Sequence, residues 1–473
     1  PQIIDSVRGV TKQLITSTSD TEQTYTNGLT AFTANGFTVG SLNDVNKDGD
    51  KLVAWSLKAG GNSNTFNVDG TGYSTASAAG LATGDITPSG AGVNTATGFS
   101  IIQYPGNSAA SATISHGLSS APELVIVKAM NLAAGWPTQG PGFFGLRLND
   151  SAGNDTGNGA VFFADTAPTS TVVTVGSVDE VNDGYNYIMY NFHSVNSYQR
   201  VGTYTGNAST YGEFVYTTSD GTATGTGGFE PAFLMVKRTT AGQTGNWRIV
   251  DNKRSTQNPR QIALFPNLSN AEDDDASQRV NFFTNGFQIA NSDASWNASG
   301  ETYLYLAIGS NPSPTPTATN SFDLTEYTGA SNSPQFVTSA SLYPQIIWNK
   351  QKAGSAAHRL LDQLRGSGNY LYPSEVNAND GYNADYIRFQ KDGDDGTVTG
   401  LYLPGADSNY NTDTWINWFW KAGTPSLNND GTITSITSVN EAAGFSIVQW
   451  QGDGNSASTV GHGIAAGAPD FVA

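Results

Sequence analysis

GFSIIQY, residues 98–104, returns almost unchanged as GFSIVQW, residues 444–450. The same order of motifs follows each copy, with SHGL at 115–118 and GHGI at 461–464. The two copies lie about 350 residues apart, and several motifs that recur in one order indicate an internal repeat. The chain is therefore built from related units.

A shorter period lies inside the long one. An apolar run that begins at a Pro and ends at a Lys occurs three times, at Pro122 to Lys128, Pro231 to Lys237 and Pro344 to Lys350. Successive runs are about 110 residues apart, which is an ordinary size for one small domain. Three units of this size account for the longer spacing.

The pattern inside a unit is that of short strands. In residues 301–308 the even-numbered side chains from Thr302 to Ile308 share one face, and Tyr303 and Tyr305 share the other. Residues 124–127 are apolar on both faces, as in an inner strand of a sandwich. With Gly and Asn turn signals every 8–12 residues, this pattern predicts an all-β fold of tandem β-sandwich repeats, of jelly-roll or concanavalin-like type.

The repeats predict the domain layout. It consists of the C-terminal half of a sandwich at 1–61, a linker or packed insertion at 62–97, sandwiches at 98–195 and 196–312, a Pro-rich linker at 313–317, a sandwich at 318–423, a linker at 424–441 and the start of a further repeat at 442–473. Because it starts and stops within a repeat, the sequence reads as a piece of a longer chain.

Composition limits the classes of function. The net charge of -18 and the pI of about 4.4 disfavour binding to nucleic acid or to an anionic membrane surface. No stretch approaches 18 apolar residues, so no membrane insertion is expected. The chain has no Cys, which excludes disulfides and thiol catalysis and favours a bacterial or viral source over a secreted eukaryotic one.

These motifs together resemble a known kind of repeat. The combination of GFSI[IV], HG[LI], the Tyr-Thr-Gly-Asn of residues 204–207, Asp-x-x-Arg and Lys-Ala-Gly is similar to the concanavalin/laminin-G-like tandem repeats of structural proteins of marine bacteriophages, including those of cyanobacteria. The resemblance covers most of the chain. It implies a virion or extracellular location, in a tail fibre or capsid fibre, and it supplies no catalytic residues.

One loop has the spacing of a calcium site. Asp44, Asn46, Asp48 and Asp50 place oxygen atoms at alternate positions, with Gly49 in the turn. The twelfth position, where a bidentate Glu would stand, is Trp55. A plain hairpin turn and a calcium loop both remain open, and no other cofactor is expected.

Two histidines occupy one position of the repeat. His116 and His462 each precede a Gly in the HG motif. A catalytic His needs a nucleophile or carboxylate partner in a fixed motif, and no such motif accompanies them. We therefore expect a structural role, with hydrogen bonds to the backbone of a hairpin.

Asp-x-x-Arg recurs in a chain with few charges. The pairs are Asp5 with Arg8, Asp251 with Arg254 and Asp362 with Arg365. A pair that recurs at one place of the unit predicts a buried or half-buried salt bridge that fixes a loop. An Arg that binds a ligand is the alternative.

The aromatic run of residues 415–420 has two interpretations. Its Trp side chains could stack on sugar rings, or they could pack in a core. Because alternation places Trp418 and Trp420 on one face, core packing is the expected use of most of these side chains.

From these features we expect a non-enzymatic structural or adhesive component of a phage virion appendage. It would contact host-surface glycans by multivalent weak binding, and it would assemble with other virion proteins and with copies of itself, a trimer among the options. A bacterial extracellular adhesin or filament protein and a jelly-roll polysaccharide depolymerase are the alternatives.

Overall fold

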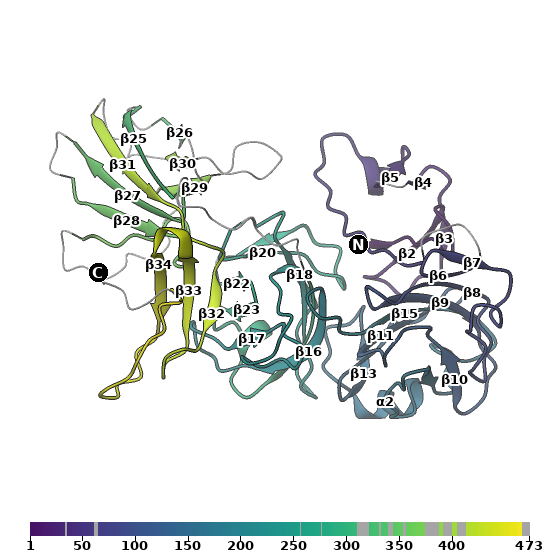
Figure 1. Cartoon of the computed structure of the whole chain (residues 1–473). Helices are drawn as coiled ribbons and strands as arrows, with labels where there is room; N and C mark the ends of the chain where they lie inside the picture. Colours follow the sequence, from purple (N-terminus) through teal and green to yellow (C-terminus); the bar gives the residue numbers. More distant parts are fainter. Residues whose placement is uncertain are drawn as a thin grey trace.

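The computed structural model describes residues 1–33, 36–60, 65–255, 257–275, 277–309, 321–330, 333–338, 344–352, 356–373, 387–390, 400–403 and 413–465. Strands dominate these ranges (Figure 1). The helices are short: α1 (Asn43–Asn46), α2 (Thr156–Phe162), α3 (Ala294–Asn297) and the 3-10 turn η2 (Glu441–Ala443). Within these ranges no helix has the length and apolar character needed to cross a membrane.

The first sandwich has one large and one small sheet. The large sheet has the order β13-β12-β11-β15-β9-β8-β6-β7, and the small sheet pairs β10 with β14. The bounds are β6 (Phe66–Val68), β7 (Thr71–Tyr73), β8 (Gly90–Asn94), β9 (Phe99–Pro105), β10 (Ala112–Ser115), β11 (Leu124–Ala129), β12 (Pro137–Gly140), β13 (Phe143–Arg147), β14 (Val172–Val175) and β15 (Asn186–Phe192). Its core lies between the two sheets and includes Ile102, Val125 and Val173.

The second sandwich begins directly after the last strand of the first. Its large sheet has the order β16-β24-β18-β19, its small sheet β17-β23-β22, and β20 pairs with β21. The bounds are β16 (Gln199–Thr205), β17 (Phe214–Tyr216), β18 (Pro231–Arg238), β19 (Arg248–Asp251), β20 (Ile262–Ala263), β21 (Asp273–Asp274), β22 (Val280–Phe283), β23 (Gly286–Ile289) and β24 (Thr302–Gly309). Leu234, Val250 and Phe287 lie in its core.

The third sandwich has the large sheet β25-β31-β27-β28 and the small sheet β26-β30-β29. The bounds are β25 (Phe322–Thr328), β26 (Gln335–Thr338), β27 (Ile346–Gln351), β28 (Arg359–Asp362), β29 (Arg388–Gln390), β30 (Gly400–Leu403) and β31 (Thr414–Trp420). Ile347, Trp415 and Phe419 are buried between its sheets.

Smaller sheets stand at the two ends of the chain. The N-terminal strands are β1 (Gln2–Ile3), β2 (Lys12–Ile15) and β3 (Gln23–Thr24) in one sheet, and β4 (Leu29–Thr33) and β5 (Gly36–Val39) in a hairpin. The C-terminal sheet has the order β32 (Ser426–Asn428), β33 (Ser435–Asn440) and β34 (Phe445–Trp450). In Figure 1 it lies beside the small sheet of the second sandwich, and Leu427 and Ile436 pack there with Phe283.

The three large sheets share one strand order. The first strand of the unit pairs with the last, the last with the third and the third with the fourth: β9-β15-β11-β12, β16-β24-β18-β19 and β25-β31-β27-β28. The prediction of an all-β protein built from sandwiches is confirmed. A single sheet of short alternating strands cannot bury its apolar face alone. Each unit therefore packs two sheets over a common core.

Two predicted linkers hold strands. Residues 62–97 contain β6, β7 and β8, which extend the first large sheet, so the alternative of a packed insertion describes this segment. The linker prediction for 424–441 was wrong, because β32 and β33 lie there and pair with β34. Small and polar side chains occur both in exposed linkers and in strands, so composition alone could not distinguish the two for this segment. The predicted Pro-rich linker at 313–317 and the end of the predicted last repeat, 466–473, lie outside the described residues.

The first two large sheets pack on one another by their outer faces. Ile101, Ile126 and Tyr190 of the first sheet share a buried cluster with Met235 and Leu306 of the second. This contact explains why residues 124–127 are apolar on both faces: one face meets the small sheet, and the other meets the next sandwich.

The N-terminal strands add to the same cluster. Leu14 is fully buried there, and Ile3 and Val7 pack around it. The cluster therefore joins the N-terminal segment, the first sandwich and the second sandwich into one body.

Candidate functional site

Each Asp-x-x-Arg pair closes the turn that follows a strand. The Arg Nε donates to Asp Oδ2 at 2.6 Å in Asp5–Arg8, 2.7 Å in Asp251–Arg254 and 2.6 Å in Asp362–Arg365. The backbone N–H of each Arg donates to the other carboxylate oxygen at 2.9 Å, and each Nη2 donates to the carbonyl two residues before the Asp. This geometry is that of a loop-fixing ion pair.

The first pair is the most enclosed. The side chains of Asp5 and Arg8 are 4% and 1% exposed, and Tyr190 Oη of the first large sheet donates to Asp5 Oδ2 at 2.8 Å. The neighbouring charges raise the pKa of Arg8 above its usual value even though burial opposes this. The N–H groups of the guanidinium already donate to protein acceptors, so few of them are available to a ligand.

His116 and His462 make the same turn. His116 Nδ1 accepts from the Leu118 N–H, and His462 Nδ1 accepts from the Ile464 N–H, both at 3.1 Å. His116 Nε2 lies 3.1 Å from the Thr169 carbonyl, so these contacts assign the neutral ring with its proton on Nε2. Burial lowers the pKa of His116 to about 4, which keeps the ring neutral at pH 7.

The proposed calcium loop has other contacts. Asp44 and Asn46 lie in α1, where the Asn46 side-chain amide donates to the Gly40 carbonyl at 2.8 Å. Asp50 pairs with Lys47 at 2.9 Å, and Asp48 is exposed. Among the described residues no group of three or more His, Asp or Glu side chains is gathered as a metal site requires, and calcium binding stays a prediction.

Sequence reasoning missed two buried lysines. Burial lowers the pKa of Lys128 to about 8 and that of Lys237 to about 7. Each ammonium donates to backbone carbonyls of a following loop, from Lys128 to Ala134 at 2.8 Å and from Lys237 to Gly245 at 2.6 Å. A perturbed Lys can signal chemistry, but these two hold loops in place.

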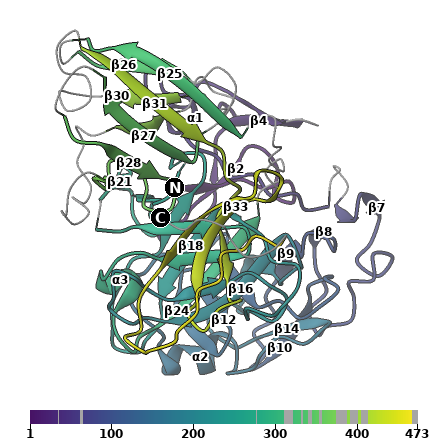
Figure 2. The ribbon, with the colours of Figure 1, turned by 60° about the vertical axis from the view of Figure 1, so that its left-hand side comes forward.

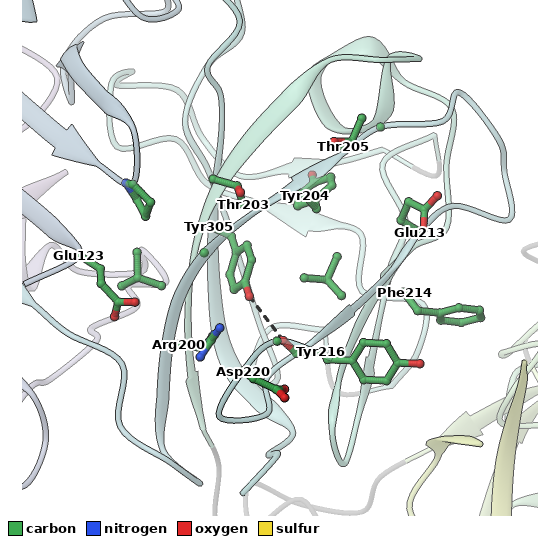
Figure 3. Close-up of a pocket in the computed structure, with 16 residues that line it drawn as sticks. Glu123, Arg200, Thr203, Tyr204, Thr205, Glu213, Phe214, Tyr216, Asp220 and Tyr305 are labelled. Atoms are coloured by element: carbon green, nitrogen blue, oxygen red, sulfur yellow. Dashed lines mark hydrogen bonds between the residues drawn. The ribbon is translucent and has the colours of Figure 1, made fainter. Parts of the chain in front are cut away.

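A groove at the edge of the second sandwich is the better candidate for binding. It has a volume of about 560 Å³ and lies where β16, the edge strand of the large sheet, faces β17, the edge strand of the small sheet (Figure 3). Glu123 and Pro141 of the first sandwich complete its wall. In the first sandwich β8 occupies the place beside β9, so the corresponding edge is covered.

The groove combines charges, hydroxyls and aromatic rings. Its polar and aromatic lining consists of Glu123, Arg200, Thr203, Tyr204, Thr205, Glu213, Phe214, Tyr216, Asp220 and Tyr305. Figure 3 shows Glu123 and Glu213 on opposite sides and Arg200 between Glu123 and Asp220. This lining offers donors and acceptors at several points of a shallow surface.

Several of these groups are held in place by hydrogen bonds. Arg200 Nη1 donates to the Ser219 carbonyl at 2.6 Å, and Glu123 Oε2 accepts from the Ser194 N–H at 2.5 Å. Bonds from the Thr222 backbone and hydroxyl lower the pKa of Asp220. Burial raises the pKa of Tyr305 to about 12, so its hydroxyl stays a donor, and it reaches the Tyr216 carbonyl at 3.4 Å.

No sequence motif marked this groove. Its residues come from six separate stretches between 123 and 305, and they meet only because two edge strands face each other. The nearest signal was the Tyr-Thr-Gly-Asn motif, whose first residues, Tyr204 and Thr205, end β16.

The fold and the groove define an all-β protein of packed sandwiches with a polar edge groove. The chain belongs to the family described as a domain of unknown function, DUF7483, whose model matches residues 1–312 and 317–473. Comparison with curated proteins and with solved structures found no match.

Proposed function

We propose that this protein is a structural and adhesive part of a phage virion appendage, a tail fibre or capsid fibre, and that it contacts host-surface glycans. The observation that carries the binding part is the groove between β16 and β17. The assignment to a virion rests on the resemblance of the repeated motifs to those of phage structural proteins.

The lining of the groove suits a sugar. Arg200, Glu213 and Asp220 supply charge-assisted hydrogen bonds for ring hydroxyls. The rings of Phe214 and Tyr216 point away from the groove and pack toward the C-terminal sheet, so polar groups would make the main contacts. Carboxylates and an Arg together also select against a purely anionic ligand. A neutral or weakly charged glycan therefore fits best.

Because the groove is shallow and open, we expect each copy of the chain to bind a glycan only weakly. An appendage presents several copies of a chain at once, and such multivalency raises the overall affinity without new contacts at any one site. The net charge of -18 favours solubility at high local concentration. Other copies of the chain and other virion proteins are the partners that this proposal requires.

A glycan array with the purified chain tests the proposal. Arg200→Ala and Glu213→Gln each remove a charged hydrogen-bonding group, and each should weaken binding to the selected glycan by roughly tenfold. Glu272→Gln, an exposed Glu of the same sandwich outside the groove, is the matched control and should bind as the unaltered chain does.

Two results would contradict this. Equal binding by all the variants would place the glycan elsewhere, and binding by none, the unaltered chain included, would remove the adhesive role. Release of oligosaccharides from a bound polysaccharide would instead favour the depolymerase alternative, which incubation of the chain with the same glycans measures directly.

A further inference from the structure

The outer face of the third large sheet carries large apolar side chains. The alternation of β31 points Trp415 and Phe419 into the sandwich and Trp418 and Trp420 out of it. Core packing, expected for most of this aromatic run, therefore holds for Trp415 and Phe419, whereas Trp418 and Trp420 lie on the other face of the sheet.

The registers of the neighbouring strands align these side chains in rows. Trp418 lies opposite Leu324 of β25 and opposite Trp348 of β27. Trp420 lies opposite Phe322 and Ile346 in the same way. Ring centroids are 5.2 Å apart for Phe322 and Trp420 and 6.2 Å apart for Trp348 and Trp418, so the rows form one continuous apolar surface. We call these six residues the outer face.

The outer face is open to solvent. Phe322 is 50% exposed and Leu324 is 46% exposed, and the three Trp side chains are half-buried. In Figure 1 the large sheet of the third sandwich lies on the side away from the first two sandwiches, with its small sheet between, and Figure 2 brings that side forward. Within the described part of the chain no other sheet packs on it.

The same positions are covered in the first two sandwiches. The shared strand order makes Leu324 and Trp418 equivalent to Ile101 and Tyr190 of the first sandwich. Those two residues are 5% and 4% exposed, because the outer face of the second large sheet and the N-terminal segment pack on them. This protein thus covers such a face with another large sheet.

The chemistry of the outer face favours a protein sheet over a sugar. The central row is wholly apolar, whereas a glycan needs hydrogen-bonding groups among the rings that it stacks on. Glu326 and Lys350 stand in the next row. Asp362, paired with Arg365, stands opposite Ile346 on the edge strand, so charged residues border the apolar side chains. Contiguous apolar surface with a polar border is typical of a protein interface.

We propose that a second copy of this chain docks on the outer face through its own outer face, in a closed two-fold dimer. The large sheets of the first two sandwiches are already buried against each other, so in the second copy the third large sheet is the one that remains free. A contact between two copies of one patch is isologous and closes on itself. This proposal is independent of glycan binding in the groove.

The interface would be modest in size. Four strands of four to seven residues span roughly 20 by 20 Å at the usual strand spacing and rise. Such an area is at the low end for specific complexes, and so we expect a dimer that dissociates on dilution.

Sedimentation velocity of the full chain over a range of concentrations, up to hundreds of micromolar, tests the proposal. The unaltered chain should shift from monomer to dimer. Leu324→Glu places a charge on the central row and should weaken dimerisation by at least roughly tenfold. Phe336→Glu is the matched control, since Phe336 is 37% exposed on the small sheet of the same sandwich, and it should dimerise normally.

Cross-linking provides a second measurement that does not depend on a destabilising variant. Because the chain has no Cys, a single Leu324→Cys gives one reactive site, and a short bismaleimide should link two copies, whereas Phe336→Cys should stay monomeric. A chain that remains a monomer, forms a trimer, or dimerises equally well as Leu324→Glu overturns the proposal. Quenching of Trp fluorescence by a glycan on a monomeric chain would also overturn it.

Discussion

At the scale of single residues, the protein uses its few charged and titratable groups to fix the backbone. His116 holds a turn by accepting from Leu118 and donating to Thr169, while Lys128 and Lys237 hold loops through backbone carbonyls. A buried polar group without a hydrogen-bond partner lowers the free energy of unfolding. Each of these groups therefore has backbone partners within hydrogen-bond distance. The sequence predicted the structural use of His116 because the same dipeptide recurred in a second copy.

The neutral state of His116 predicts a pH dependence. Burial lowers its pKa from 6.5 to about 4, so between these values the unfolded chain binds a proton that the folded chain does not. The free energy of unfolding should therefore fall as the pH drops from 6.5 to 4, by about 3 kcal/mol from this residue, and it should change no further from this cause below pH 4.

Urea unfolding at several pH values measures this dependence. His116→Asn should be less stable at pH 7 and should lose less stability on acidification than the unaltered chain does. His358→Asn, at a half-buried ring that accepts from the Trp348 indole at 3.0 Å, is the comparison at another histidine. An equal loss of stability in the His116→Asn variant and in the unaltered chain would show that His116 is not the group that titrates.

At the scale of elements, one turn follows three strands. β1, β19 and β28 each lead into an Asp-x-x-Arg turn with the same set of hydrogen bonds. This element was predictable because its contacts lie within five residues of chain. The groove was not, because β16 and β17 become neighbours only through the packing of two sheets.

Replacing Asp5 tests how much the Asp-x-x-Arg turn contributes to the stability of the fold. Asp5→Ala leaves the enclosed Arg8 guanidinium and the Tyr190 hydroxyl without their acceptor, and it should destabilise the chain by about 3–5 kcal/mol. Asp50→Ala breaks an ion pair of the same i,i+3 spacing whose side chains are half exposed, and it should cost at most about 1 kcal/mol. Thermal and urea unfolding give both values, and equal costs would contradict the structural role of the first pair.

At the scale of the whole molecule, the buried cluster between the first two large sheets holds the parts together. It takes residues from the N-terminal segment and from both sandwiches, which makes them one cooperative body. At the other end of the chain Leu364, at the position that Val7 holds in its own turn, packs on Leu427 and Ile436 of the C-terminal sheet.

A substitution of Leu14 tests whether the buried cluster holds the N-terminal segment on the sandwiches. Leu14→Ala should leave a cavity in the cluster and destabilise the chain by about 2–5 kcal/mol, and limited proteolysis should then cut the N-terminal segment faster. Leu52→Ala, at a side chain that is 58% exposed, should leave both the stability and the cleavage rate nearly unchanged. Unaltered cleavage in the Leu14→Ala variant would show that the N-terminal segment is held by other contacts.

Alternation and recurring motifs were enough to predict the all-β fold class and the turns at the Asp-x-x-Arg and His-Gly motifs. These features depend on alternation and on residues that are neighbours in the chain. The fold was needed to place strands β6, β7, β8, β32 and β33 in segments that composition marks as linkers, to bring two edge strands together around a groove, and to turn Trp418 and Trp420 outward. The reason is physical: which face of a sheet is covered depends on partners far away in sequence, and alternation says only that two faces exist.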